Sequence, residues 1–450
     1  MERFDVIVVG AGTAGCLAAK SAAEVGLKVC LIDVKNVEDI GKKVCGDAIG
    51  KHHFDCLRLR YPCGEELERK VEGVFIYSPN RESVFKVSGE GLHGFIINRH
   101  MFGQRLLKES LDAGTELYHS TKVLGPLLKE HGVRGVRVRK TGSSTKDILS
   151  SIVIDASGMN AVVRRNLPDE LGIEKEPDKA DVIACYREIR VLKEQIPEPE
   201  FLRIYLNSQV APGGYYWVFP EGGNRVNVGL GVAMSEGFPN PRTQLYRHVL
   251  SQPIFEGSKI IHGGGGLVPT RRPLDKMVAD GLMLVGDAAF QVNPLHGGGI
   301  GPSMIAGRIS GEVAVKASEK GFFSTESLWQ YGVEYIRSYG AKQAGLDVFR
   351  FFLQKLGDED LNYGMKNKLI TEEDLLITSM GDDLELNITE KAARLFRSLG
   401  KVSLIRRLRK VASLMQKIKS HYSLYPLTTE GFVEWRNTTL KILREARSAL

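Results

Sequence analysis

The chain has 450 residues, 43% of them hydrophobic and 26% charged, and it carries a formal net charge of +7. This length predicts two or three packed units, and the composition is ordinary for a globular protein. The longest apolar stretches, such as residues 281–285, are far shorter than the ~20 residues that span a bilayer. The first residues lack the character of a signal peptide. We therefore exclude a membrane-spanning chain and expect a soluble, cytoplasmic protein.

The first recognisable element is a strand–turn–helix unit at the start of the chain. A β-branched run over residues 6–9 predicts a buried parallel strand, and it leads into Gly10-x-Gly12-x-x-Gly15 and a helix from residue 17 to 25. In such a loop the first glycine permits the turn, the second admits a pyrophosphate, and the third allows the helix to pack closely. A second strand, residues 28–32, ends on Asp33, whose carboxylate suits ribose hydroxyls. The unit predicts a dinucleotide site.

A polar loop, Gly41-Lys-Lys-Val-Cys-Gly-Asp47, follows and contains one of six cysteines. The six include no Cys-x-x-Cys pair and no iron–sulfur set, so we predict no metal site and no disulfide scaffold. Lys42 and Lys43 would favour the Cys45 thiolate, whereas an apolar pocket would favour the neutral thiol. Both states remain open from the sequence.

The next segment predicts a second part of the nucleotide-binding unit. Strands are expected over residues 73–77 and 84–87, and then a helix over 99–113 capped by Asn98. A strand near 115–119 leads into a β-meander that returns through residues 148–154 and ends in Asp155-Ala-Ser-Gly158. A meander at this place is typical of FAD proteins, whereas NAD dehydrogenases usually have a second βαβαβ half here.

Residues 166–267 lack a βα rhythm and predict a separate antiparallel sheet. Its densest aromatic stretch is Pro212-Gly-Gly-Tyr-Tyr-Trp-Val-Phe-Pro220. Strand alternation places Tyr215, Trp217 and Phe219 on one face. That face is either part of a sandwich core or the apolar wall of a pocket.

A second glycine-rich helix start follows. The strand at residues 281–285 ends in Gly286-Asp287, and Asn293-Pro-Leu-His-Gly-Gly-Gly-Ile-Gly301 precedes a helix over 303–317. Asp287 suits a ribityl hydroxyl, and the dipole of the helix can stabilise negative charge on a reduced flavin.

The C-terminal segment, residues 326–450, is predicted to be almost wholly helical. Residues 401–420 contain seven Lys and Arg and no acid, interleaved with apolar residues at helical spacing. Two interpretations remain open: a basic amphipathic helix on an anionic membrane surface, or a helix packed on the core with a solvated basic face. We do not expect a nucleic-acid partner.

Taken together, these motifs resemble those of a known family. The glycine loop, Arg99, Asp155-x-x-Gly158 and Gly286-Asp287 are similar to the FAD fold of p-hydroxybenzoate hydroxylase and its relatives. Lys43-Val-Cys-Gly-Asp47, Pro212-x-x-Tyr-x-Trp-x-Phe-Pro220 and Pro294-Leu-His-Gly-Gly-Gly-Ile300 resemble geranylgeranyl reductases, most closely the archaeal lipid-reducing branch. The resemblance covers almost the full length, although few motifs match beyond about residue 372.

The resemblance implies a reductase that uses FAD to saturate isoprenoid chains of archaeal membrane lipids. Cys45 is implied as the catalytic group beside the flavin, and it is the sequence's candidate proton donor to an alkene. Tyr215, Trp217 and Phe219 are candidate substrate contacts. The implied cofactor contacts are Gly10, Gly12, Ala14, Gly15, Asp33, Cys45, Gly46, Asp47, Arg99, Val123, Asp287, Gly298, Gly299 and Ile300.

The expected fold class is α/β, with a Rossmann-type FAD-binding domain and its meander, an antiparallel substrate domain and a helical C-terminal region. The expected boundaries are 1–165 and 268–325 for the FAD-binding domain, 166–267 for the substrate domain and 326–450 for the helices. Strands near 72–98 are candidates for the substrate sheet. The electron donor is NADPH or reduced ferredoxin, and a location on the inner face of the membrane is expected. The rival functions are an FAD monooxygenase or halogenase and a non-catalytic prenyl-lipid carrier.

Overall fold

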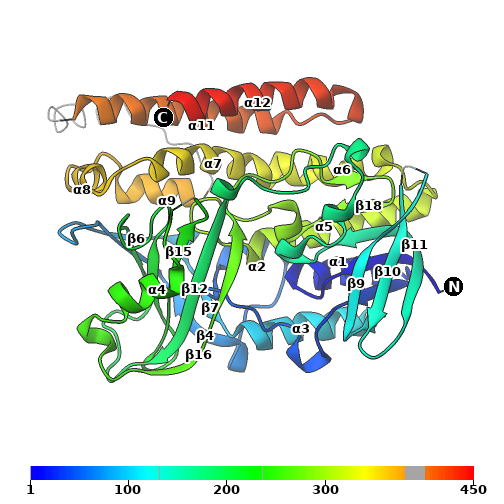
Figure 1. The fold of residues 1–450 in the computed structure, drawn as a ribbon, viewed down its shortest axis with the longest axis horizontal. Helices are drawn as coiled ribbons and strands as arrows, with labels where there is room; N and C mark the ends of the chain where they lie inside the picture. Colours follow the sequence, from blue (N-terminus) through cyan, green and yellow to red (C-terminus); the bar gives the residue numbers. More distant parts are fainter. Residues whose placement is uncertain (1, 131, 236, 381–400, 450) are drawn as a thin grey trace.

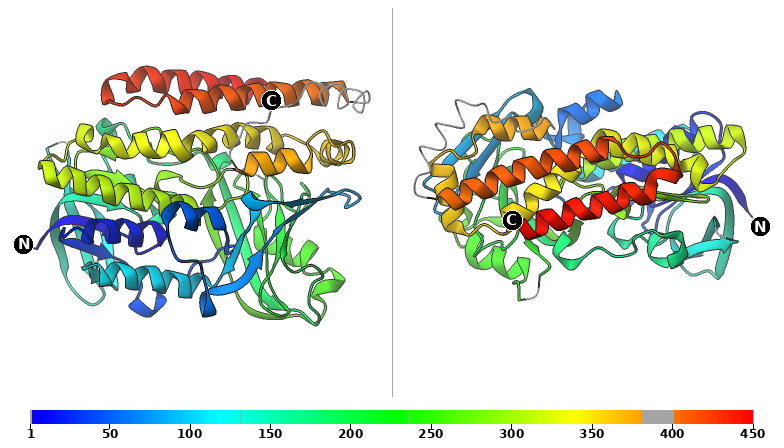
Figure 2. Two further views of the ribbon diagram at one scale, coloured as in Figure 1. Left: turned by 180° about the vertical axis from the view of Figure 1, so that it is seen from behind. Right: turned by 90° about the horizontal axis from the view of Figure 1, so that it is seen from above.

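The structure, a computed structural model, describes residues 2–130, 132–235, 237–380 and 401–449. Figure 1 shows a layered molecule in which two sheets lie side by side and helices cover them, with a pair of long C-terminal helices as the outermost layer. The same layering is visible from behind in Figure 2. The predicted fold class is confirmed by this arrangement.

The first sheet has eight strands in two parts, a parallel core and an antiparallel extension. The core runs in the order β18-β11-β1-β2-β8 with parallel pairing throughout, β17 pairs antiparallel with β18 at its edge, and β10 and β9 extend antiparallel from β11. Because both faces of the core are covered, the second half of the central strand β1, residues 6–9, is a continuous apolar run. The strands are β1 (Arg3–Val9), β2 (Val29–Ile32), β8 (Glu116–Tyr118), β9 (Thr121–Lys129), β10 (Gly132–Lys140), β11 (Thr145–Asp155), β17 (Val278–Ala279) and β18 (Leu282–Leu284).

Three helices pack together on this sheet: α1 (Thr13–Ala23), α3 (Arg99–Asp112) and α5 (Ile300–Lys320). The predicted cap of α3 is present, because the Asn98 side chain accepts a hydrogen bond from the Met101 N–H. The α5 helix approaches α1 closely at two glycines. A Cβ at Gly307 would lie 2.2 Å from the Ala14 carbonyl oxygen, and one at Gly311 would lie 2.7 Å from that of Ala18. Helix α2 (Lys51–Leu57) contacts α5 as well.

The second sheet has seven strands in the order β16-β12-β15-β14-β13-β5-β6. All neighbours pair antiparallel except β13 and β5, which are parallel, so two strands from early in the chain complete the sheet. Its strands are β5 (Gly73–Tyr77), β6 (Val84–Ser88), β12 (Val182–Val191), β13 (Phe201–Tyr205), β14 (Tyr216–Pro220), β15 (Arg225–Ala233) and β16 (Lys259–Pro269). A small sheet of β3 (Ala48–Gly50), β7 (Gly94–Ile97) and β4 (Leu67–Val71) lies in the order β3-β7-β4, and the short helix α4 (Pro241–Gln244) contacts β12 and β15.

The C-terminal part is helical, as predicted for the residues that the structure describes. Its α-helices are α6 (Thr325–Tyr335), α7 (Ala341–Gln354), α8 (Asp358–Lys366), α9 (Glu372–Met380), α11 (Val402–Ser423) and α12 (Phe432–Ala449). Helices α11 and α12 form the outer pair in Figure 1 and lie on α7.

The basic segment at 401–420 forms most of α11, and its apolar side is covered. Leu404, Val411 and Ile418 are buried in the main core, where α11 contacts α7 and α12. On the outer side, Lys410 and Lys417 pair with Glu445 of α12. The structure thus matches the second interpretation of this segment, a packed helix with a basic outer face. None of the described helices is long and apolar enough to cross a membrane.

Candidate active site

The glycine loop between β1 and α1 has the geometry that its spacing predicts. Gly10 has a φ of +103°, and a Cβ there would lie 2.5 Å from the Ala156 carbonyl oxygen. A Cβ at Gly15 would lie 1.8 Å from the Gly10 carbonyl oxygen, so only glycine permits this close helix–strand packing. At Gly12 no atom lies within 4 Å of that position. The open space at Gly12, before the N-terminus of α1, suits a pyrophosphate.

Asp33 is held beside this loop at the end of β2. Its carboxylate accepts hydrogen bonds from the Ala11 N–H at 2.7 Å and the Lys35 N–H at 2.8 Å. These contacts fix the carboxylate next to the glycine turn, where ribose hydroxyls of a dinucleotide are bound in folds of this kind.

Arg99, the first residue of α3, is buried, and its Nε and Nη1 have no hydrogen-bond partner in the described structure. Buried guanidinium donors need acceptors, and a phosphate is among the best. Arg99 also lies close enough to Cys45 and Asp47 to influence both electrostatically. The unsatisfied Arg99, the open space at Gly12 and the fixed Asp33 together fit the phosphate and ribose groups of FAD.

The second glycine-rich corner closes the same region. Asp287 lies near the start of α5, where a Cβ at Gly299 would be 3.4 Å from its Oδ1, and its Oδ2 pairs with Lys43 Nζ at 2.9 Å. Ile300 begins α5, with Gly299 as its cap and Gly298 just before. The ion pair between Lys43 and Asp287 therefore connects the loop that contains Cys45 to the segment before α5.

Three residues of these predicted sites have mainly structural surroundings. Asp155 is fully buried and accepts hydrogen bonds from the backbone N–H groups of Ser157, Val163 and Arg164, so it shapes its own turn. Val123 on β9 and Ala14 on α1 are buried in the main core. The predicted contacts of Val123 and Ala14 with the cofactor stay predictions.

Cys45 lies where its loop meets the second sheet. Its carbonyl oxygen accepts hydrogen bonds from Arg187 Nε of β12 at 3.0 Å and Asn227 Nδ2 of β15 at 2.9 Å. Burial raises the pKa of the Cys45 thiol and the charge of Asp47 raises it further, against the opposing effects of Arg99, the Asp47 backbone N–H and, last, Lys43. This direction favours the neutral thiol.

Asp47 is buried beside this thiol and has a φ of +61°. Its Oδ2 accepts a hydrogen bond from Asn227 Nδ2 at 3.0 Å and lies 3.6 Å from Arg187 Nη2, whereas its Oδ1 has no partner. Burial raises the pKa of Asp47 to about 6, against the charges of Arg187 and Arg99. Sequence reasoning missed Arg187 and Asn227, because no local motif marks them.

The aromatic stretch packs as a buried cluster beside this region. Tyr215, Trp217 and Phe219 share a face, as alternation predicts, while Tyr216 and Val218 pack into a different cluster. Trp217 Nε1 donates to Asn227 Oδ1 at 3.0 Å, and the Tyr215 hydroxyl donates to the His296 carbonyl oxygen at 2.7 Å. Phe219 lies against Gly46, where a Cβ would be 3.2 Å from its ring. The aromatic face therefore adjoins both the Cys45 loop and the loop before α5, and its contact with a substrate stays a prediction.

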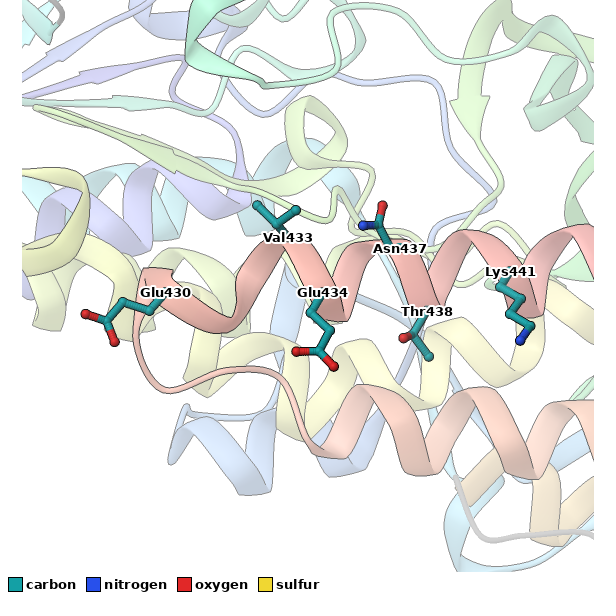
Figure 3. Close-up of a pocket in the computed structure, with 6 residues that line it drawn as sticks. All are labelled: Glu430, Val433, Glu434, Asn437, Thr438 and Lys441. Carbon is teal, nitrogen blue, oxygen red and sulfur yellow. The ribbon is translucent and has the colours of Figure 1, made fainter.

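An open groove elsewhere on the molecule involves none of these residues. Figure 3 shows it along α12 in the outer helical layer. Its lining is mostly polar and charged and consists of Glu430, Val433, Glu434, Asn437, Thr438 and Lys441. The groove contains no residue of the predicted site.

Comparison with known proteins supports the assignment of cofactor and chemistry. A family model described as "Glucose inhibited division protein A" matches residues 5–59, and one described as "Geranylgeranyl reductase catalytic domain" matches residues 181–268. A geranylgeranyl bacteriochlorophyll reductase-like structure from Thermoplasma acidophilum has a TM-score of 0.75 at 25% identity and covers 91% of this chain and 100% of its own. The flavin-dependent brominase Bmp2 shares the fold, with a TM-score of 0.62 at 16% identity over 91% of this chain and 100% of its own. Fold and site define an FAD-dependent oxidoreductase.

The sequence relatives specify the family. A digeranylgeranylglycerophospholipid reductase from Sulfolobus acidocaldarius is 42% identical over 100% of this chain and 99% of its own length. One from Methanothrix thermoacetophila is 34% identical over 80% of this chain and 90% of its own. This chain belongs to the digeranylgeranylglycerophospholipid reductase family, and it is an enzyme of the class that reduces carbon–carbon double bonds.

Proposed function

We propose that this enzyme saturates the geranylgeranyl chains of archaeal membrane glycerophospholipids, with Cys45 as the proton donor. The observation that carries the proposal is the position of the partly buried Cys45, whose thiol has a raised pKa, where the two glycine-rich loops meet the second sheet. The names of the relatives support the substrate class. The aromatic face of Tyr215, Trp217 and Phe219 suits an apolar chain beside that thiol.

The chemistry requires two groups on opposite carbons of the alkene. An isolated trisubstituted double bond has no carbonyl to polarise it, so hydride addition needs an acid that protonates the other carbon as positive charge develops. FAD, when bound and reduced, supplies the hydride from its N5. Cys45 Sγ–H supplies the proton, and Arg187 and Asn227 fix the Cys45 backbone through its carbonyl oxygen. The electron donor that reduces the bound FAD again is NADPH or reduced ferredoxin.

The first experiment is an anaerobic assay of the purified holoenzyme. The protein is reduced with dithionite, mixed with geranylgeranylated glycerophospholipid, and the lipid masses are recorded. Stepwise gains of two hydrogens per double bond are expected. Unchanged lipid in the presence of fully reduced flavin would contradict the proposal: bound but unaltered lipid would favour a prenyl-lipid carrier, and oxygen-dependent oxidation of NADPH stimulated by an aromatic substrate would favour a monooxygenase or halogenase.

We also propose a peripheral location on the cytoplasmic face of the membrane. The support is the exposed basic side of α11, which includes Arg406 and Arg409 and suits anionic lipid head groups. Because the apolar side of α11 is buried, this attachment is electrostatic. Reversing both charges, Arg406→Glu with Arg409→Glu, should weaken binding to anionic vesicles and lower activity on them more than in detergent. Equal losses in both assays would argue against it, and Lys108→Glu on α3 is the control.

A further inference from the structure

The strongest unexplained feature of the site is the carboxyl of Asp47, two residues after Cys45. Its backbone lies in the left-handed region, which a non-glycine residue adopts only rarely. In this conformation Asp47 and the Cys45 thiol are close enough for each to shift the pKa of the other. The loop thus brings two proton-carrying side chains together.

The partners of Asp47 leave one of its oxygens unsatisfied. Asn227 Nδ2 donates to Oδ2 at 3.0 Å, and Asn227 itself is held by Trp217. Arg187 contacts the same oxygen at 3.6 Å, but its Nε and Nη1 are directed to the Cys45 carbonyl oxygen and to His262. Oδ1 is buried without a partner. Burial without a partner for Oδ1 disfavours the charged form of this carboxyl, so that Asp47 takes up a proton more readily than an exposed aspartate does.

We propose that Asp47 returns a proton to Cys45 after each reduction, and this inference rests on the proposed function. The Cys45 Sγ–H bond breaks as the new C–H bond forms on one alkene carbon, and the other carbon takes the hydride that reduced FAD would supply when bound. The Asp47 carboxylate then takes a proton from the solvent and passes it to the Cys45 thiolate, which restores the thiol. Asp47 acts through Cys45 as a proton relay and does not itself contact the alkene.

The charges around Asp47 are consistent with this direction of transfer. Burial raises the pKa of Asp47 to about 6, against Arg187 of β12 and Arg99 of α3, while the pKa of the Cys45 thiol is raised by burial and by Asp47. A carboxyl with the lower pKa gives its proton to the thiolate readily. Glu221, just after β14, is another buried acid close enough to interact with Asp47, and burial raises its pKa to about 7. Glu221 is not among the groups that shift the Cys45 pKa.

The direct test measures the Cys45 thiol in the oxidised holoenzyme, without turnover. Iodoacetamide alkylation is followed at Cys45 by mass spectrometry between pH 6.5 and 9.5 in wild type and in Asp47→Asn. Because the amide removes the negative charge beside the thiol, Cys45 should react faster in the variant, about tenfold for each unit by which its pKa falls. Glu221→Gln, the same change in a neighbouring buried acid, should follow the wild-type profile. Superimposable profiles for Asp47→Asn and wild type would overturn the proposal.

If Asp47→Asn does not fold, which the absence of bound FAD would show, a second variant tests the same inference. Asn227→Ala removes the donor to Asp47 Oδ2, so the carboxyl should keep its proton to a higher pH and Cys45 should alkylate faster between pH 6.5 and 8. No change at Cys45 in this variant would also contradict the inference.

Turnover separates this inference from the proposed function. In Asp47→Asn the first double bond should be saturated at a near-normal rate in a single turnover, because Cys45 begins protonated, whereas steady-state turnover should fall about 10²-fold. Steady-state turnover at the wild-type rate would overturn the proposal. If wild-type enzyme saturates no lipid, the proposed function fails, while the alkylation profiles still report whether Asp47 controls Cys45.

Discussion

Two aspartates of this enzyme are buried to a similar degree, but their pKa values are shifted in opposite directions. Asp47 is 5% exposed and Asp181, which immediately precedes β12, is 3% exposed. Burial raises the pKa of Asp47 to about 6. Burial also opposes ionisation of Asp181, but Arg350 and then Arg271 outweigh it, and the pKa of Asp181 is lowered.

The difference lies in the number and distance of the cations. Asp181 Oδ1 is 2.6 Å from Arg350 Nη2, and its Oδ2 is 3.8 Å from Arg271 and 3.5 Å from Arg447. These arginines come from α7, from the segment after β16 and from α12, so the cluster joins the helical layer to the ends of two strands of the second sheet. Asp47 has one arginine at 3.6 Å and an unsatisfied oxygen. A fully paired carboxylate suits stability, and an incompletely paired one suits proton transfer.

The largest expected effect comes from removing the thiol beside Asp47. Cys45→Ser should leave yellow, FAD-loaded protein but reduce saturation about 10²- to 10⁴-fold, because a serine hydroxyl is a much weaker acid. Product masses and flavin absorbance measure the two properties. Cys185→Ser, at a second partly buried thiol on β12, is the matched control. Near-normal product from Cys45→Ser would remove Cys45 from the mechanism.

The second prediction concerns Asp181. Asp181→Asn removes the carboxylate that Arg350 and Arg271 share, but Arg350 keeps Asp347 and Arg271 keeps Glu174. The free energy of unfolding should therefore fall by about 1.5–3 kcal/mol. Denaturant unfolding of the holoenzyme at pH 7 measures it. Asp47→Asn in the same experiment should lose much less. Equal losses for the two variants would abolish the distinction between the clusters.

The pH dependence of stability should differ in sign between the two sites. Because the pKa of Asp181 is lowered in the folded protein, its carboxylate contributes stability at pH values above its unfolded-state pKa. That contribution is lost as the pH falls through its folded-state pKa. At Asp47 the folded pKa is raised from 3.8 to about 6, so its contribution declines as the pH rises between these values. Asp47→Asn should remove that decline, at most about 3 kcal/mol, from unfolding curves recorded between pH 4 and 6.5. An unchanged pH profile would contradict the assignment.

Arg99 offers an intermediate case, a buried cation whose Nε and Nη1 have no hydrogen-bond partner in the described structure. Arg99→Gln should weaken FAD binding about 10- to 100-fold, since hydrogen bonds between charged groups contribute ~1.5–3 kcal/mol. Titration of the apoprotein with FAD, followed by flavin fluorescence, measures the change. Arg105→Gln on the same helix is the control, because that guanidinium pairs with Glu66 and Glu109. Equal effects of the two variants would exclude a specific role for Arg99.

The smallest expected effect is at the contact between the sheet and the loop before α5. Tyr215→Phe removes only the hydrogen bond to the His296 carbonyl oxygen, so turnover should fall by no more than about tenfold. Steady-state kinetics on detergent-dispersed lipid measure it. A loss as large as that of Cys45→Ser would mean that the Tyr215 hydroxyl takes part in the chemistry.

Local patterns allowed much of this site to be predicted from the sequence. The roles of Gly10, Gly12 and Gly15 follow from backbone sterics within one turn, and the faces of Tyr215 and Trp217 follow from strand alternation. These features depend on neighbours a few residues away. A short stretch of sequence is therefore enough to predict them.

The polar cluster beneath Cys45 was not predictable in this way. Arg187 and Asn227 lie 142 and 182 residues after Cys45 along the chain, and each reaches it only through the pairing of strands in the second sheet. The protonation state of Cys45 depended on this packing, since neighbouring lysines and burial oppose each other. The parallel pairing of β13 with β5 was likewise a long-range outcome with no local signal.

The order of strands in the first sheet has a consequence for how the protein is made. Strand β18 pairs with β11 at Val153, Ile154 and Asp155, yet residues 156–281 are synthesised between them. At 5–20 residues per second, a ribosome takes about 6 to 25 seconds to cover that interval. During this time an apolar strand edge of the nascent cofactor domain lacks its permanent neighbour. The newborn chain is thus most exposed to misassociation, and most dependent on chaperones, while the second sheet is still emerging.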